Sequence, residues 1–320
     1  FLLSSVATGF VLVYTKPVLM PLVFSIFCYF GSLPLVSFLE KNLRFPRTLA
    51  SCCTAVVVGG VFFALIFQIS LSLKILFLEL NNYRASFLYF IDEVIILARS
   101  YGFKIENAAH YDYIENLPIK DIFANFIGST FGFIGNSLLI IVIYFFLILG
   151  RFKGKKGKSS RFFNEISLKV SSYIIYKFFL SILTGFFIWL ILFSFGVKLA
   201  FVFGVFAFIL NFIPSLGSII ATILPIPMMA FQFGLGTKFF ILLFLCSVVQ
   251  IVIGNFIDPR MIGKDLDLHP IVIILSLIFW GLLWGVGGAF LAVPLTATVK
   301  IFLSKMETSK KVSEILAGRF

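Results

Sequence analysis

A stretch of about 30 residues near the C-terminus, residues 270–299, contains no charged side chain. A helix of about 20 consecutive apolar residues crosses the hydrocarbon core of a bilayer, so this stretch is long enough to span a membrane. Residues that weaken helices interrupt it: Gly281, Gly285, Gly287, Gly288 and Pro294. We therefore expect one membrane-spanning segment with a weak point, preceded by a polar loop over residues 255–269.

The composition extends this conclusion to the whole chain. Hydrophobic residues make up 60% of it, charged residues 12%, and its mean hydropathy is +1.09. Soluble domains carry about 25% charged residues. The apolar runs are continuous, which argues against a membrane β-barrel with alternating strands of about 10 residues. The net charge of +12 does not indicate nucleic-acid binding, because the basic residues flank apolar runs as the positive-inside rule predicts. We predict an all-α polytopic membrane protein.

Counting the apolar runs predicts about eight transmembrane helices, some broken by proline or glycine, in a single domain over residues 1–320. The basic segment 151–172 indicates a cytoplasmic loop, with binding to anionic headgroups as the alternative. The C-terminal tail is also basic, so we expect both termini in the cytoplasm, although a re-entrant pair at Pro214 or Gly287 would change the parity. The sequence begins at Phe1 rather than Met, so we expect either a trimmed terminus or a fragment.

Residues 71–125 differ from the spans around them. Apolar side chains recur there at spacings of three and four, among five basic and seven acidic side chains. That spacing is typical of an amphipathic helix. We predict an amphipathic helical insert between the third and fourth spans, on the outer side of the membrane.

Two apolar runs are broken at membrane depth. The first break contains Asn211, Pro214 and Gly217, and the second contains Gly285, Gly287 and Gly288. Broken backbone survives in a membrane only where protein or a watery cavity covers it. The prolines could simply kink a helix, and the glycines could serve either close helix packing or a moving hinge. We predict that both segments line a permeation path and move.

The polar loop and the helix before it supply further candidate contacts. Gln250 and Asn255 offer side-chain amides, each both donor and acceptor. Asp258 and Arg260 could form an ordinary loop ion pair or contact a solute. His269 precedes a proline at a helix start, where capping is the default role, but histidine titrates near neutrality and could also contact a proton or a solute.

No Asp or Glu lies inside the predicted spans, whereas cation pathways usually contain intramembrane carboxylates. Lys177, Lys198 and Lys238 are expected to snorkel from span ends. The polar groups left at depth are neutral: Asn136, Thr184, Asn211, Gln232, Gln250, Ser276 and Thr296. We therefore expect a neutral polar cargo and not a bare cation.

Enzymatic and metal-binding functions have no support in the sequence. It has no His-Glu-x-x-His motif, no carboxylates paired at metal-ligand spacing, and no catalytic constellation around His110 or His269. The four cysteines lie in or beside apolar runs, and we interpret them as small hydrophobic residues. We expect no cofactor, no metal and no enzyme. A scaffold would not need broken helices.

Three motifs carry a family resemblance. They are Ile213-Pro-x-Leu-Gly217, the loop Pro259-Arg-Met-Ile-Gly263 with Leu268-His-Pro270, and Gly285-x-Gly-Gly288 followed by Ala292-Val-Pro-Leu295. In this order, over nearly the whole chain, they resemble the autoinducer-2 exporter family of bacterial inner-membrane permeases. This chain departs from that pattern at Asp258, where an apolar residue is more usual.

The resemblance implies a transporter of the bacterial inner membrane, with the lipid bilayer and a small solute as partners. We predict a permease for a small polar solute, with export of autoinducer-2-like signal molecules as the direction that the resemblance favours. A sodium/proton antiporter is the alternative, and a channel or structural membrane protein comes third. H⁺ or Na⁺ is the candidate coupling ion, and a homo-oligomer is a further candidate assembly. The cargo and the coupling ion are not specified by the sequence.

Overall fold

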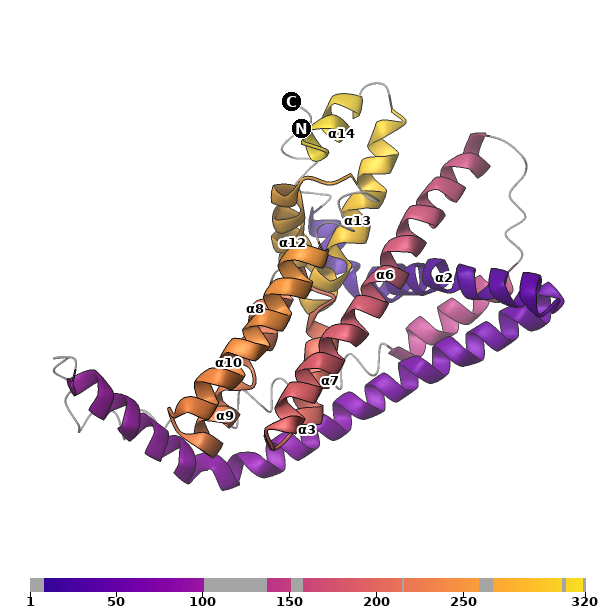
Figure 1. The fold of residues 1–320 in the computed structure, drawn as a ribbon. Coiled ribbons are helices and arrows are strands. Elements are labelled where there is room, and N and C mark those ends of the chain that lie inside the picture. The colour runs from indigo at the N-terminus through magenta and orange to yellow at the C-terminus, as the bar shows by residue number, and fades with distance from the viewer. Residues whose placement is uncertain are drawn as a thin grey trace.

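The computed structural model describes residues 9–100, 137–150, 158–214, 216–258, 267–306 and 309–318. Within these residues the chain is helical throughout, and it turns at short loops (Figure 1). Six helices are long and apolar enough to cross a membrane: Lys16–Asn42, Arg47–Ser72, Glu165–Ser194, Leu216–Phe233, Thr237–Gly254 and Val286–Ser304. Shorter apolar helices cover Ser137–Leu149, Ala200–Leu210 and Pro270–Trp284. The prediction of an all-helical polytopic membrane protein is confirmed.

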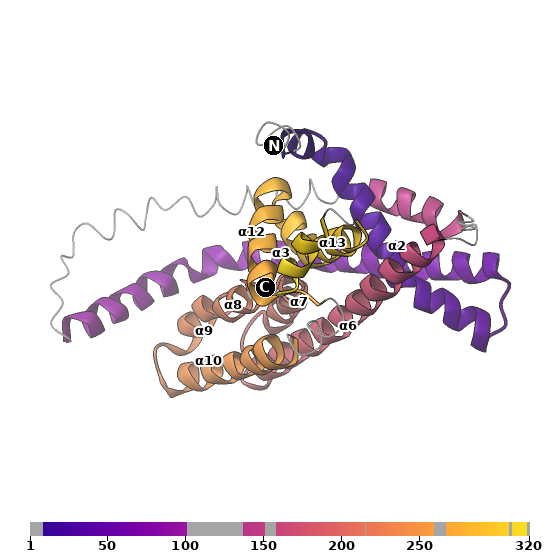
Figure 2. The ribbon, with the colours of Figure 1, turned by 90° about the horizontal axis from the view of Figure 1, so that it is seen from above.

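The first half of the chain forms two long helices. Helix α2 covers Lys16–Asn42, and α3 covers Arg47–Ser100. At 1.5 Å per residue, α3 is about 80 Å long, more than twice the hydrocarbon thickness. It changes direction partway and reaches beyond the other helices in both views (Figures 1 and 2). The third span and the start of the predicted insert at residue 71 are therefore one continuous helix, because no Gly or Pro interrupts residues 61–100. Residues 101–125 lie outside the described part.

Helix α6 covers Lys158–Ser194 and is the central element of the second half. It contacts α2, α10 and α13, and most extensively α7 (Ala200–Leu210). The basic segment predicted as a loop over 151–172 is helical from Lys158 onward, since the glycines that favour a loop end at Gly157. Residues 151–157 lie outside the described part.

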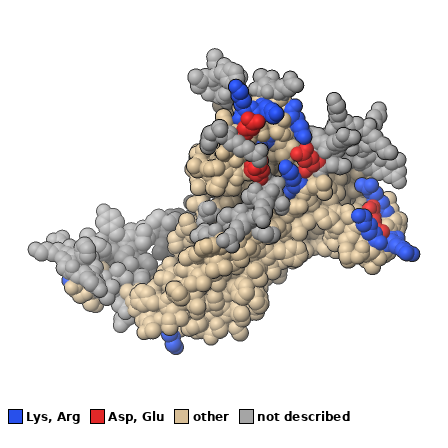
Figure 3. All heavy atoms as spheres, turned by 45° about the horizontal axis from the view of Figure 1, so that its top comes forward, with Lys and Arg blue, Asp and Glu red and all other residues tan. Residues whose placement is uncertain are grey.

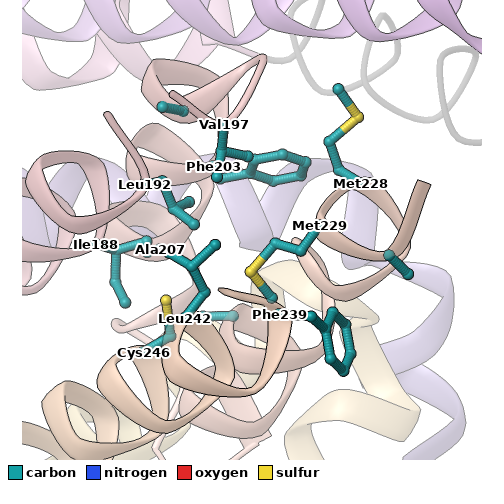
Figure 4. Close-up of a cluster of buried hydrophobic side chains, with 13 residues drawn as sticks. Ile188, Leu192, Val197, Phe203, Ala207, Met228, Met229, Phe239, Leu242 and Cys246 are labelled. Carbon is teal, nitrogen blue, oxygen red and sulfur yellow. The ribbon is translucent and has the colours of Figure 1, made fainter. Parts of the chain in front are cut away.

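Short helices follow α7. They are α8 (Leu216–Ile223), α9 (Ile226–Phe233) and α10 (Thr237–Gln250), which continues into the π-helix η1 (Ile251–Ile257). The break after α7, at residues 211–214, falls where the sequence predicts it, and a second break at Leu224 and Pro225 separates α8 from α9. Buried side chains of α6, α7, α9 and α10 form one apolar core, including Leu192, Phe203, Met229 and Leu242 (Figure 4).

The last apolar stretch is a helical hairpin and not the single span that its composition predicts. Helix α12 covers Pro270–Trp284, and α13 covers Val286–Ser304. Between them Gly285 adopts φ 71°, a backbone conformation that favours glycine. The helices pack side by side, and the Trp280 indole Nε1 donates to Thr296 Oγ1 at 3.1 Å. A charge-free run of this length does not by itself reveal a turn, which is why the prediction of one span is wrong.

The terminal helix α14 (Lys310–Leu316) packs against α13. The space-filling view shows charged side chains mainly over the end formed by α13 and α14 and at the far end of α2, while the broad face over α6–α10 is largely uncharged (Figure 3). Large apolar side chains such as Phe179, Phe193 and Phe244 are exposed on these helices. This is the surface that a lipid bilayer covers.

Candidate functional site

One face of α6 carries a buried row of polar side chains. Tyr173, Lys177, Ser181 and Thr184 follow one another at spacings of four, four and three, which places them on one side of the helix. All four are buried, and Lys177 is only 1% exposed. We call this row, together with the polar side chains of other helices that meet it, the polar seam.

Lys177 forms a buried ion pair with Asp258. The ammonium Nζ lies 2.5 Å from the carboxylate Oδ2, and Asp258 is 5% exposed. Two sequence-based expectations are therefore wrong: Lys177 does not snorkel from a span end, and a carboxylate does lie among the apolar helices. Removing one partner of such a pair leaves an uncompensated buried charge, at a cost of about 3–5 kcal/mol.

The π-helix η1 explains why Asp258 faces inward. A π-helix repeats at i→i+5 and occurs frequently at functional sites. Ile253 and Asp258 are five residues apart and are both buried. In an α-helix of 3.6 residues per turn, that spacing would turn the two side chains well away from each other. The polar loop predicted over residues 255–269 includes Asp258, whereas the structure places this residue at the end of η1.

Asn211 joins the seam one helical turn further along α6. Its amide Nδ2 donates to Ser181 Oγ at 3.0 Å, and Asn211 is 2% exposed. Ser181 follows Lys177 by four residues, a rise of about 6 Å. The structure thus brings two residues singled out in the sequence, Asn211 and Asp258, to neighbouring points on one helix face.

Two buried polar groups, on α10 and at the end of η1, have unmet hydrogen-bonding capacity among the described residues. Both amide atoms of Gln250 are buried without a partner, and so is Asp258 Oδ1. Gln250 ends α10, which packs against α6. Buried polar groups are nearly always satisfied, and the exceptions need an explanation such as a water, an ion or a functional role.

Gln232, another glutamine that the sequence places within the apolar spans, has a hydrogen-bond partner for each of its two amide atoms. Its Oε1 accepts from the Lys198 amide at 2.9 Å, and its Nε2 donates to the Gly196 carbonyl at 2.7 Å. These two hydrogen bonds stabilise the turn between α6 and α7. By contrast, the buried amide of Gln250 has no hydrogen-bond partner among the described residues that would explain its position.

The α7–α8 turn is tight. It includes Pro214, and a Cβ on Gly217 would lie 1.8 Å from the Leu210 carbonyl oxygen. Only glycine fits at this approach. The turn that positions Asn211 against α6 is therefore fixed by the residues that the sequence singled out as a helix break.

The α12–α13 hairpin holds its candidate glycines in packing contacts. A Cβ on Gly288 would lie 1.9 Å from the Trp280 carbonyl oxygen, and one on Gly287 would lie 1.8 Å from Met20 Cε of α2. In this conformation Gly287 and Gly288 allow close helix packing, and Gly285 forms the turn itself.

His269 caps α12. Its Nδ1 accepts from the Ile271 amide at 3.3 Å, and its own amide donates to the Leu316 carbonyl at 3.1 Å. This is the default role expected from its position before Pro270. Arg260 lies outside the described residues, as does the side chain of Asn255, so neither can be placed relative to the seam.

A second ion pair joins Lys300 of α13 to Asp267. Nζ lies 2.8 Å from Oδ2 and also donates to the Asp267 backbone carbonyl. The Asp267 side chain is 43% exposed, unlike that of Asp258. No group of three His, Cys, Asp or Glu side chains that could hold a metal ion occurs in the part of the chain that the structure describes.

Sequence reasoning singled out Asn211, Gln250 and Asp258 but missed Tyr173, Lys177 and Ser181. One signal was available for Lys177. The candidate membrane span of α6 runs from Glu165 to Ser194, so Lys177 lies near its middle and not at an end. A lysine at that depth requires a partner.

Comparison with known proteins adds to this geometry. The model of a family described as AI-2E family transporter matches residues 2–308. The AI-2 transport protein TqsA of Escherichia coli is 28% identical over 315 residues, which cover 95% of this chain and 90% of TqsA. A protein of Borreliella burgdorferi is 28% identical over 259 residues, 77% of this chain and 70% of its own length. The E. coli protein YhhT is 40% identical over 147 residues, 46% of this chain and 41% of YhhT.

Proposed function

Because this chain belongs to the AI-2E family of transporters, we propose that it is a secondary transporter that carries a small polar solute along the polar seam of α6. The observation that carries this proposal is the unmet hydrogen-bonding capacity of two buried groups, the Gln250 amide and Asp258 Oδ1, among the described residues. A solute with hydroxyl groups would donate to the carboxylate and both donate to and accept from the amide.

The favoured cargo is an autoinducer-2-like signal molecule, moved outward across the bacterial inner membrane. Support comes from TqsA, a relative over 95% of the chain whose name assigns it AI-2 transport. The neutral cargo inferred from the sequence rested on an absence of buried carboxylates, and Asp258 removes that basis. The proposal therefore specifies a polar solute and leaves its charge open.

The broken segments supply the moving parts in this proposal. The α7–α8 turn places the end of one short helix and the beginning of another next to Asn211, which contacts the seam at Ser181. The segment Gly285–Gly288 forms the second moving element, with the turn at Gly285 as its pivot. Rocking of these segments would expose the seam to one side of the membrane at a time.

The experiment is AI-2 efflux from proteoliposomes with no gradient, with a pH gradient and with a sodium gradient. We expect efflux by the wild-type protein, loss of efflux in Asn211→Leu, and normal efflux in Phe179→Leu, which changes a lipid-facing side chain. Both variants are compared only after gel filtration shows that they are folded. Absence of AI-2 efflux under all three conditions would remove AI-2 as the cargo.

A sodium/proton antiporter is the second candidate, and the buried Asp258–Lys177 pair favours it, because intramembrane carboxylates mark cation and proton routes. Sodium-driven proton release with no solute flux would select this candidate.

The proposed orientation has both termini in the cytoplasm. Cysteine labelling at Ser159 and Asn107 in intact cells tests it: we expect the two positions to react from opposite sides, and labelling from one side would contradict this topology.

A further inference from the structure

We propose that Asp258 is a proton-binding site, paired with Lys177, and that protonation of its carboxylate drives α6 and the α10–η1 helix apart during the transport cycle. This inference rests on the proposed function only in assigning the movement to a transport cycle. The proton itself is the ligand.

The geometry separates two faces of the carboxylate. Oδ2 lies 2.5 Å from Lys177 Nζ, whereas Oδ1 is buried without a hydrogen-bond partner among the described residues. A proton can therefore add to Oδ1 without first breaking the contact to the lysine. Oδ1 is the carboxylate oxygen whose lone pairs the described residues leave unused.

Protonation changes the net charge of the pair from zero to plus one. Lys177, 1% exposed, would then be a buried ammonium without a compensating anion. Such a charge is costly in a low-dielectric interior, so the ammonium must reach water or another partner. Because Lys177 belongs to α6 and Asp258 follows η1, the two helices separate. Release of the proton to the other side of the membrane restores the anion and the pair.

The other groups facing Asp258 do not offer a substitute counter-charge. Tyr173 and Tyr176 of α6 are the remaining titratable side chains in electrostatic contact with Asp258 among the described residues. The Tyr176 hydroxyl donates to the Ile257 carbonyl at 3.4 Å. Tyr173 packs against apolar Leu268, Val293 and Ala297, and η1 itself has no titratable side chain.

The other buried lysine shows what a structural pair looks like in the same protein. Lys300 is held by both the carboxylate and the backbone carbonyl of Asp267, and that carboxylate is 43% exposed. Protonation of Asp267 would leave Lys300 with the carbonyl and nearby water. Asp267→Asn is therefore a matched control, which removes a carboxylate from a lysine pair without removing a buried proton site.

The first arm of the test measures movement without any solute. Spin labels at Leu183→Cys on α6 and Val252→Cys on η1, two exposed positions, are introduced into a chain lacking its four native cysteines. Distances are measured by electron double resonance in liposomes at pH 8 and pH 5. We expect a shift to longer distances at pH 5 in the wild-type background and in Asp267→Asn, and a distribution insensitive to pH in Asp258→Asn.

The second arm measures AI-2 efflux driven by an imposed pH gradient. We expect Asp258→Asn to lose the acceleration by the gradient, and Asp267→Asn to keep it. If Asp258→Asn does not fold, the double variant Lys177→Met/Asp258→Leu replaces the pair by apolar side chains, and the same loss of pH response is expected. An unchanged distance in the wild-type background, or a pH response that survives in the Asp258 variants, would overturn the proton site.

The two arms separate the two proposals. A pH-dependent distance without AI-2 efflux would leave the proton site standing and reject the cargo. AI-2 efflux with an equal pH dependence in wild type and Asp258→Asn would support AI-2 as the cargo and reject the proton site.

Discussion

Lys177 and Asp258 dominate the energetics at the residue scale, because each is a buried charge whose only ion-pair partner among the described residues is the other. The gain from such a pair is offset by the cost of removing both ions from water, so the intact pair contributes little net stability. Removal of only one partner destabilises the protein, because a single uncompensated buried charge remains. This asymmetry makes the pair testable without a transport assay.

We predict that Lys177→Met lowers the free energy of unfolding by about 3–5 kcal/mol, and that Lys177→Met/Asp258→Leu recovers most of that loss. Thermal unfolding in detergent of the wild type, both single variants and the double variant measures the coupling. If the two single effects simply add in the double variant, the pair does not exist in the protein.

Substitution of Gln250 and substitution of Gln232 should change the stability of the protein in opposite directions. Gln250→Leu removes two unsatisfied buried polar atoms and is expected to leave stability unchanged or raise it by about 1–3 kcal/mol, while reducing AI-2 efflux. Gln232→Leu removes two hydrogen bonds at the α6–α7 turn and is expected to lower stability by about 1–3 kcal/mol. Thermal unfolding and efflux are measured on the same preparations. Equal destabilisation by both substitutions would contradict the unmet hydrogen-bonding capacity of Gln250.

At the scale of elements, the hairpin α12–α13 depends on the close approach of its two helices. Gly288 and Gly281 both lie in helices, but only Gly288 lies against the backbone of the other helix. An added methyl group should therefore be costly at one glycine and tolerated at the other.

We predict that Gly288→Ala destabilises the protein by about 1–3 kcal/mol through overpacking against Trp280. Gly281→Ala, whose Cβ would meet its nearest neighbour at 3.8 Å, is expected to be neutral or stabilising by up to about 1 kcal/mol. Comparison of the two melting temperatures is the measurement. A larger loss for Gly281→Ala would place the helix contact elsewhere.

The sequence predicts elements well where breakers are explicit. Pro214, Gly217 and Pro225 mark the ends of α7, α8 and α9 as the structure has them. It fails where the decisive feature leaves no local signal. Gly285 is one of several glycines in its stretch, so the sequence does not identify it as the turn. Residues 251–257 likewise contain no pattern that indicates a π-helix rather than an α-helix.

The candidate site was therefore only partly predictable. Asn211 and Gln250 stand out as amides in apolar runs, but their relation to α6 depends on tertiary packing. Lys177 is visible as a charge, but the predicted loop over residues 151–172 places it close to a span end, whereas the candidate span begins at Glu165. Once that helix is extended, the lysine requires a buried anion, and Asp258 becomes its candidate partner.

At the scale of the whole molecule, charges lie mainly at its ends and apolar side chains cover the faces between them (Figure 3). The bilayer therefore surrounds a largely apolar bundle in which the Lys177–Asp258 pair and Asn211 lie buried along α6. If a solute crosses this bundle along the polar seam, a reagent of similar size and polarity should be able to follow it.

The most direct measurement is the reactivity of Ser181→Cys in a chain without its native cysteines. Ser181 is fully buried and lies beside Asn211 in the seam. We predict that a small, charged methanethiosulfonate reagent modifies this cysteine in functioning proteoliposomes, that modification stops AI-2 efflux, and that AI-2 slows the reaction. Modification of the control variant Phe179→Cys, on the lipid-facing side of α6, should leave efflux intact. A Ser181→Cys protein that transports AI-2 normally and never reacts would show that the solute does not pass along the polar seam.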